Sequence, residues 1–305
     1  MRVGKWLKNT LIYLGIRLLL GLVRLLGWER SRRLGRWLGR RAWQLAGKER
    51  RVCLRQLAWA FPEMNEEQRR QLSRRVFEHL GQAAAEVANV RRAPELSEWV
   101  EVGPDSRRVL DEALARGRGV VFVTAHCGNW ELMARTLARL GYPINTIGRA
   151  SYDPRLTRLI DDFRRQGGVH TLWRGDPELG HRLVEVLRRG EIMGFLIDQD
   201  TRVPGEFVPF FGKPAHTPSA PVTLARKTGA AVVVGFNHRR RPDGYAVKIS
   251  SFQFSRESDE KRALLEDLAG LSRLIEEHIT AHPEEWVWMH RRWRTRPPGE
   301  AGEGR

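Results

Sequence analysis

Residues 119–131 read GVVFVTAHCGNWE, an apolar run that is followed closely by a histidine and a glutamate. The short apolar run predicts a buried β-strand over 119–124. His126 then lies just beyond its carboxyl end, the edge at which open α/β sheets bind their ligands. Gly128 permits a tight turn, and Asn129 suits the N-cap of a helix over 129–140. The stretch therefore predicts a strand–turn–helix unit with a polar site at the turn.

Alternating strand and helix signals continue after this unit. Further strands are expected at 143–147, 168–172, 191–197, 230–237 and 245–252, and further helices at 154–166, 177–189, 218–228 and 258–281. A hairpin turn is expected at Pro242-Asp-Gly244. This order predicts an α/β fold with a mixed, largely parallel central sheet flanked by helices. Upstream, Asn65 and Gln68 are spaced as a helix capping box.

Four segments are expected along the chain. They are a basic, membrane-associating helical segment over 1–50, a helical region packed on the core over 51–100, an α/β core over 101–297 that holds the candidate site, and a disordered tail over 298–305. The N-terminal segment holds thirteen basic and two acidic residues, out of a net charge of +17 for all 305 residues. A mean hydropathy of −0.46 excludes a polytopic membrane protein, so any bilayer contact is local.

The bilayer contact is expected in the apolar run over 9–28, which Arg17 and Arg24 interrupt on one helical face. Tryptophan and arginine residues flank the run, as is typical of the lipid headgroup level. We expect an interfacial or shallowly inserted helix on an anionic membrane surface; a single span and a helix packed on the protein's own core are the alternatives. The sequence has no zinc-finger, RNP or basic-heptad motif, so no nucleic acid partner is expected. Two cysteines form no disulfide framework, which fits a reducing compartment.

The chemistry is expected at His126 and Glu131. A turn between strand and helix lets these side chains meet, with neutral His126 as general base and Glu131 fixing its tautomer. Free N–H groups at the helix start are candidates to stabilise an oxyanion. A histidine after a strand is more often structural, and His-Cys suggests metal. Because further ligands at metal-like spacing are lacking, no metal is expected.

Resemblance decides between these interpretations. His126-x4-Glu131 after a strand resembles the His-x4-Asp/Glu signature of the lysophospholipid and lipid A acyltransferase superfamily. Five further segments are similar in order to the lipid A biosynthesis (lauroyl/myristoyl) acyltransferase family: 60–63 (AFPE), 198–200 (DQD), 207–212 (FVPFFG), 224–229 (LARKTG) and 283–293 (PEEWVWMHRRW).

The resemblance implies an enzyme on the cytoplasmic face of the inner membrane. Such an enzyme transfers a fatty acyl chain from acyl carrier protein, or a coenzyme A thioester, to a hydroxyl of a lipid A precursor or related glycolipid, without a metal or organic cofactor. A phosphatidylinositol mannoside or a lysophospholipid is the alternative acceptor. A non-catalytic membrane-surface binding protein is the alternative of a different class.

Six further residues are candidates for substrate binding. Arg149 is similar to a family arginine and would clamp a phosphate or phosphopantetheine. Asp198 and Asp200 are expected either beside His126 as a carboxylate pair or as caps of their own loop. Asn129 and the terminal pair Arg291 and Arg292 complete the set, with packing as the alternative for the two arginines. Cys127 is expected to pack rather than to act as a nucleophile.

Overall fold

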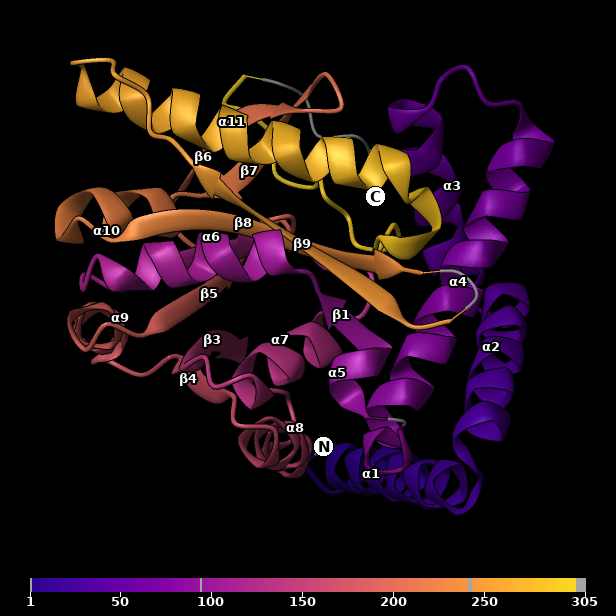
Figure 1. The fold of residues 1–305 in the computed structure, drawn as a ribbon. Coiled ribbons are helices and arrows are strands. Elements are labelled where there is room, and N and C mark those ends of the chain that lie inside the picture. The colour runs from indigo at the N-terminus through magenta and orange to yellow at the C-terminus, as the bar shows by residue number, and fades with distance from the viewer. Residues whose placement is uncertain (1, 94, 241–242, 300–305) are drawn as a thin grey trace.

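The computed structural model describes residues 2–93, 95–240 and 243–299, and its centre is a seven-stranded sheet in the order β1-β9-β8-β2-β5-β3-β4 (Figure 1). The strands are β1 (Val100–Val102), β2 (Val120–Thr124), β3 (Ile144–Arg149), β4 (His170–Arg174), β5 (Ile192–Leu196), β8 (Ala231–Arg239) and β9 (Tyr245–Phe252). Among these seven strands, as far as the structure describes them, neighbouring strands run parallel except for β8 and β9, which are antiparallel. A separate antiparallel hairpin consists of β6 (Gly205–Phe210) and β7 (Lys213–Pro218).

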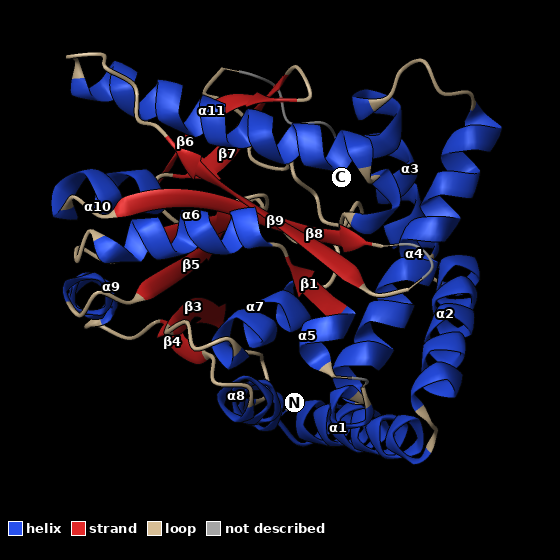
Figure 2. Cartoon of the chain, in the orientation of Figure 1, coloured by secondary structure: helices blue, strands red, loops and turns tan. Residues whose placement is uncertain are grey.

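Helices cover both faces of the sheet (Figure 2). They are α1 (Arg2–Leu25), α2 (Trp28–Leu45), α3 (Gly47–Ala60), α4 (Glu66–Ala88), α5 (Leu96–Trp99), α6 (Pro104–Ala115), α7 (Trp130–Arg139), α8 (Pro154–Gln166), α9 (Leu179–Arg188), α10 (Ala220–Thr228) and α11 (Glu260–Ala281), with short 3-10 turns at Val90–Arg92 and Pro283–Glu285.

Strand β2 shows how the apolar run divides between two cores. Side chains alternate across a strand, so Val121 and Val123 face one core while Val120 and Phe122 face the other. The first core includes residues of α3, α4, α9, α10 and α11, and the second includes residues of α5, α6 and α7. Because β2 is covered on both faces, all five of its residues are buried, as expected for a central parallel strand.

Helices α2 and α4 pack backbone against backbone at the edge of the core. A Cβ atom added to Gly35 would lie 2.4 Å from the Gly81 carbonyl oxygen, and one added to Gly39 would lie 2.1 Å from that of Phe77. Glycine is therefore required for this helix approach. Helix α4 begins at the predicted capping box, in which Asn65 and Gln68 each accept the other's backbone N–H.

Helix α1 lies along the bottom of Figure 1, beside α8, and carries most of its apolar side chains outward. Leu11 and Leu18 are 62% and 66% exposed, whereas Val23 is buried. Residues Trp6–Leu25 are long and apolar enough to cross a membrane. The helix contacts the body through Arg155 of α8, which donates to the Thr10 hydroxyl and stacks on Tyr13.

The predicted fold class is confirmed: the sheet is mixed and largely parallel, and helices flank it. The helix over 154–166 and the strand over 245–252 have the predicted bounds, and the other strands and helices predicted after residue 118 differ by one or two residues at one or both ends. Strand β1, helix α6 and the β6–β7 hairpin were not predicted. Pro242 of the predicted turn and residues 300–305 of the predicted tail lie outside the described residues, although β8 and β9 do form a hairpin from Arg239 opposite Tyr245.

Candidate active site

His126 and Asp198 meet because their strands are neighbours in the sheet. Strands β2 and β5 pair in parallel, with Thr124 opposite Leu196. His126 and Asp198 each lie two residues beyond that pair, at the carboxyl edge of the sheet. The Nδ1 atom of His126 is 2.9 Å from Oδ1 of Asp198, and the His126 backbone N–H donates to Oδ2 at 3.0 Å.

Asp198 is fully buried and holds three N–H donors. The third is Nε1 of Trp286, at 2.7 Å from Oδ2. Burial alone would raise the pKa of Asp198, but the charge of His126 and these hydrogen bonds outweigh it and lower the pKa to about 2. The group is therefore a carboxylate at neutral pH. A carboxylate facing Nδ1 keeps the proton on that nitrogen and leaves the lone pair on Nε2.

Glu131 does not contact the imidazole, which corrects the prediction from the His-x4-Glu spacing. Helix α7 begins at Trp130, and its first turn directs Glu131 toward α8. There the carboxylate forms a bidentate ion pair with Arg164, at 2.5 Å and 3.0 Å. The carboxylate that orients His126 is that of Asp198. The ring of His126 packs edge-on against Trp130, with centroids 5.0 Å apart.

His126 and Glu131 both line a cavity of about 1180 Å³ at the carboxyl edge of the sheet. This is large for a small-molecule site. Apolar side chains from both faces of the sheet line it: Met133, Leu137, Ile144, Ile147, Val169, Leu179 and Leu183. Gly148 of β3 and Gly194 of β5 also line the wall, and a Cβ atom added to Gly148 would lie 2.7 Å from the Trp173 ring, so glycine lets this ring pack against β3.

Arginines also line the cavity. Arg149 and Arg174 end the neighbouring strands β3 and β4 and lie directly opposite each other in the register. Burial and the charge of Arg149 lower the pKa of Arg174. Arg164, Arg202 and Arg294 also line this cavity. The concentration of guanidinium groups favours an anionic ligand such as a phosphate.

Asp200 reaches the cavity but is engaged by the C-terminal segment. Its carboxylate accepts the Thr295 N–H at 2.7 Å and pairs with Arg294 at 3.3 Å, and its own N–H donates to Nε2 of His290. The two aspartates of the Asp-Gln-Asp segment therefore differ in role, since only Asp198 touches His126.

Two of the predicted substrate-binding residues, Asn129 and Arg292, are buried in structural contacts, and a third, Arg291, is exposed away from the cavity. Asn129 is buried; it caps α7 by accepting the Leu132 N–H and donates to Glu86 of α4. Arg292 is buried on the β6–β7 hairpin, where it donates to the His216 carbonyl and the Thr217 hydroxyl. Arg291 is exposed and is not among the cavity-lining residues. Its neighbours His290 and Arg294 line the cavity in its place.

The turn after His126 is held by the segment that follows α11. Cys127 pairs with Trp286 in an isolated antiparallel bridge, and the Gly128 N–H donates to the Glu285 carbonyl at 3.1 Å. Gly128 has φ +59°, and a Cβ there would lie 2.3 Å from the Asn237 carbonyl oxygen, so only glycine fits. Burial raises the pKa of the Cys127 thiol well above its usual value, which disfavours a thiolate nucleophile.

Comparison with known proteins identifies this arrangement. Residues 4–295 match the family described as bacterial lipid A biosynthesis acyltransferase. The chain belongs to this family. Its relatives include the lipid A biosynthesis lauroyltransferase of Escherichia coli K12, 30% identical over 88% of this chain and 86% of the relative, and the palmitoleoyltransferase of that strain, 28% identical over 88% and 86%. The phosphatidylinositol mannoside acyltransferase of Mycobacterium tuberculosis CDC 1551 is 28% identical over 60% of this chain and 57% of the relative. Membership of the lipid A acyltransferase family makes this chain an acyltransferase.

Sequence reasoning missed several residues of this candidate site, among them Arg164, Arg174 and Trp286. Arg174 ends a predicted strand as Arg149 does, so its position was a usable signal. Arg164 lies in a helix rich in basic residues, and Trp286 lies in a segment with several tryptophans. In both places the sequence offers several residues of the same type, and nothing in it singles out the one at the site.

Proposed function

We propose that this protein transfers a fatty acyl chain from an acyl thioester to a hydroxyl of a lipid A precursor or related glycolipid, with His126 as general base. The observation that supports this most strongly is the pairing of Nδ1 of His126 with Asp198 at the wall of a cavity that is part apolar and part arginine-lined.

In this mechanism Nε2 of His126 accepts the proton of the acceptor hydroxyl as its oxygen attacks the thioester carbonyl carbon. Asp198 stabilises the imidazolium that forms. The C–S bond then breaks, and the departing sulfur takes the proton from the imidazolium as the free thiol. The Trp130 and Glu131 N–H groups begin α7 and are proposed to stabilise the oxyanion, as helix starts favour negative charge.

Glu131 acts in this proposal as a positioning residue. Its ion pair with Arg164 ties the first turn of α7 to α8, and it holds the Arg164 guanidinium at the cavity wall. We assign Arg149 and Arg174 to phosphate recognition, on the donor's phosphopantetheine arm or coenzyme A or on a phosphorylated glycolipid. The apolar residues would take the acyl chain.

The exposed apolar surface of α1 supports work at a membrane surface. The helix lies beside α8, whose Arg164 lines the cavity, so lipid bound by α1 would be close to the site. The basic residues of α1 and α2 favour anionic lipids. We therefore place the enzyme on the cytoplasmic face of the inner membrane, where acyl carrier protein or coenzyme A thioesters are available.

A phosphatidylinositol mannoside is the second candidate acceptor, favoured by the similarity to the mycobacterial enzyme. A lysophospholipid would use the same chemistry. All three acceptors offer a hydroxyl near a charged headgroup, so the proposed roles of His126 and Asp198 are common to them.

An activity assay on the purified protein in detergent tests the proposal. Two donors are supplied separately: a labelled fatty acyl thioester of acyl carrier protein, and the same acyl chain as its coenzyme A thioester. Each donor is paired with a tetraacylated lipid A precursor, a phosphatidylinositol mannoside and a lysophospholipid, and acylated products are identified by mass spectrometry. We expect an acylated glycolipid from the wild type and a loss of about 10³-fold in His126→Ala. Equal turnover in both proteins would exclude His126 as the base. A lack of product from every pair would instead support a non-catalytic binding protein.

A further inference from the structure

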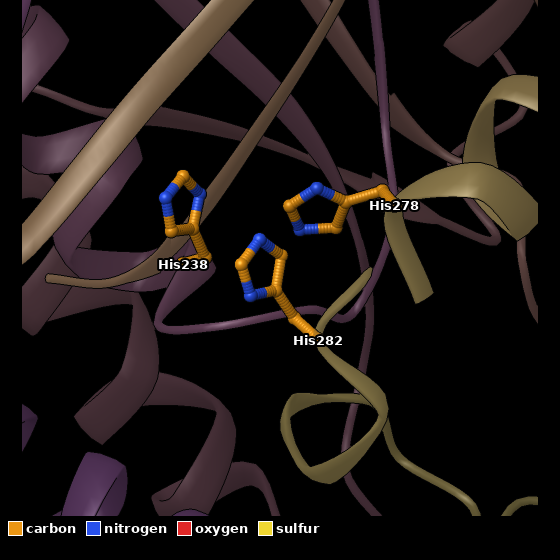
Figure 3. Close-up of side chains that lie close together, drawn as sticks. All are labelled: His238, His278 and His282. Atoms are coloured by element: carbon orange, nitrogen blue, oxygen red, sulfur yellow. The ribbon is translucent and has the colours of Figure 1, made fainter. Parts of the chain in front are cut away.

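Three histidines gather where the end of β8 meets the C-terminal end of α11, and none of them is among the residues that line the acyl-transfer cavity (Figure 3). His238 lies near the end of β8, His278 lies in the last turn of α11, and His282 caps that helix. One ring nitrogen from each lies within 4.8 Å of the others, and all three side chains are half-buried. Residues 278 and 282 are one helical turn apart, which brings them to one face.

His278 offers a free nitrogen to this cluster. Its Nε2 is buried without a hydrogen-bond partner among the described residues. A ring nitrogen without a partner is available to a metal ion. Nδ1 of His238 is likewise buried and unpaired within the described part of the chain.

Two charged side chains act on the cluster. Lys248 contributes a positive charge at His238, and Glu284 contributes a negative charge at His282, so the two partly offset each other. Metal binding uses the lone pairs of neutral imidazoles.

We propose that His238, His278 and His282 bind a divalent transition metal ion, with Zn²⁺ the best match. Three imidazoles and a water molecule form a common tetrahedral zinc set. Zinc–nitrogen bonds of about 2.0–2.1 Å place ligand nitrogens about 3.4 Å apart, so the cluster must contract slightly. The rings of His238 and His282 are stacked, 9° from parallel with centroids 4.1 Å apart. Since a metal lies in the plane of each ligand ring, binding turns one of these rings about its Cβ–Cγ bond.

The site links β8 to the C-terminal end of α11. His282 is followed directly by the 3-10 turn Pro283–Glu285 and then by Trp286, whose indole donates to Asp198. A metal at the three histidines would therefore fasten the segment that supports the catalytic carboxylate. Its proposed effect is on stability rather than on the chemical step.

The test uses full-length protein in detergent, prepared without a polyhistidine tag and freed of metal by a chelator. Zn²⁺ affinity is measured by competition with a chromophoric chelator, the visible absorption of Co²⁺ reports coordination, and melting temperature is recorded with and without Zn²⁺. We expect one tightly bound ion, a tetrahedral Co²⁺ spectrum and a raised melting temperature. His238→Ala, His278→Ala and His282→Ala should each lower Zn²⁺ affinity at least about tenfold.

His181→Ala is the matched control, because His181 is exposed and pairs with Glu185 on α9 far from the cluster. It should leave Zn²⁺ affinity unchanged. Each variant is compared with its own metal-free melting temperature, so a variant that is merely less stable still reports binding. If one substitution prevents folding, the other two decide. A wild type that binds no Zn²⁺, or affinity lost in His181→Ala and kept in the three cluster variants, would overturn the proposal.

Discussion

Replacing Asp198 by asparagine changes the proton position on His126 with little change in shape. The carboxylate holds two N–H donors on Oδ2, from the His126 backbone and Trp286, and one on Oδ1, from Nδ1. An asparagine keeps one oxygen and gains an NH₂ group. Its oxygen should take the place of Oδ2, because the reverse orientation leaves two N–H groups facing NH₂. The NH₂ then donates to Nδ1, and the imidazole proton moves to Nε2.

In this variant the active tautomer, with the proton on Nδ1, is higher in free energy than the inactive one. It loses a charge-assisted hydrogen bond of about 1.5–3 kcal/mol and leaves a buried donor unsatisfied, at about 1–3 kcal/mol. Each 1.4 kcal/mol is about tenfold in rate, so kcat should fall by about 10²–10⁴. Initial rates at saturating donor and acceptor measure the loss, and circular dichroism confirms that the variant is folded.

The matched control is Asp267→Asn. Asp267 is also buried and accepts hydrogen bonds from Arg226 and the Ser255 N–H, but it lies on α11 and does not line the cavity. It should lose stability and keep kcat within about threefold of wild type. A folded Asp198→Asn enzyme that keeps more than about a tenth of the wild-type rate would refute the tautomer argument.

Three further predictions concern the ion pair, a buried acid and the membrane helix. A double-mutant cycle of Glu131→Gln and Arg164→Gln should give a coupling of about 1 kcal/mol in unfolding free energy, whereas additive losses would show that the pair contributes nothing. Burial raises the pKa of Glu285 from 4.5 to about 7. The protonated carboxyl therefore adds to the free energy of unfolding in full below pH 4.5, and this stabilisation is lost as pH rises through 7. Urea unfolding should therefore show that the free energy of unfolding of Glu285→Gln, relative to that of the wild type, rises by about 2–3 kcal/mol between pH 4.5 and 8. A difference between the two proteins that does not change with pH would contradict this. Leu11→Ser with Leu18→Ser should weaken vesicle binding at least about tenfold at an unchanged melting temperature, because both side chains are exposed; undiminished sedimentation with vesicles would place the contact elsewhere.

The alternation of strands and helices was predictable from the sequence because it depends on local patterns. The run Val120–Thr124 is apolar throughout, as a strand covered on both faces must be. The short strand Val100–Val102 was missed because three residues carry too little periodicity. The β6–β7 hairpin was missed since Pro209, Pro214 and Pro218 within it usually argue against a strand.

Asp198 beside His126 was one of two alternatives that the sequence left open, and local spacing pointed to Glu131 as the partner of His126 instead. Glu131 is near in sequence, but the helix that begins at Trp130 turns it toward α8. Asp198 is distant in sequence and becomes a neighbour because β5 lies next to β2 in the sheet. Strand order is a tertiary property that strand lengths and turns leave open. The same reasoning applies to Arg149 and Arg174, which are opposite each other only because β3 pairs with β4.

The central claim is that Asp198 holds the Nδ1 proton of His126 and leaves Nε2 free to accept one. Nitrogen-15 NMR of protein labelled at its histidines measures this most directly. The signals of His126 are assigned as those missing from the spectrum of His126→Ala. At a pH where the ring is neutral, we predict a protonated Nδ1 and an unprotonated Nε2 in the wild type, and the opposite tautomer in Asp198→Asn. A wild-type imidazole protonated on Nε2, or a tautomer that Asp198→Asn leaves unchanged, would contradict the account.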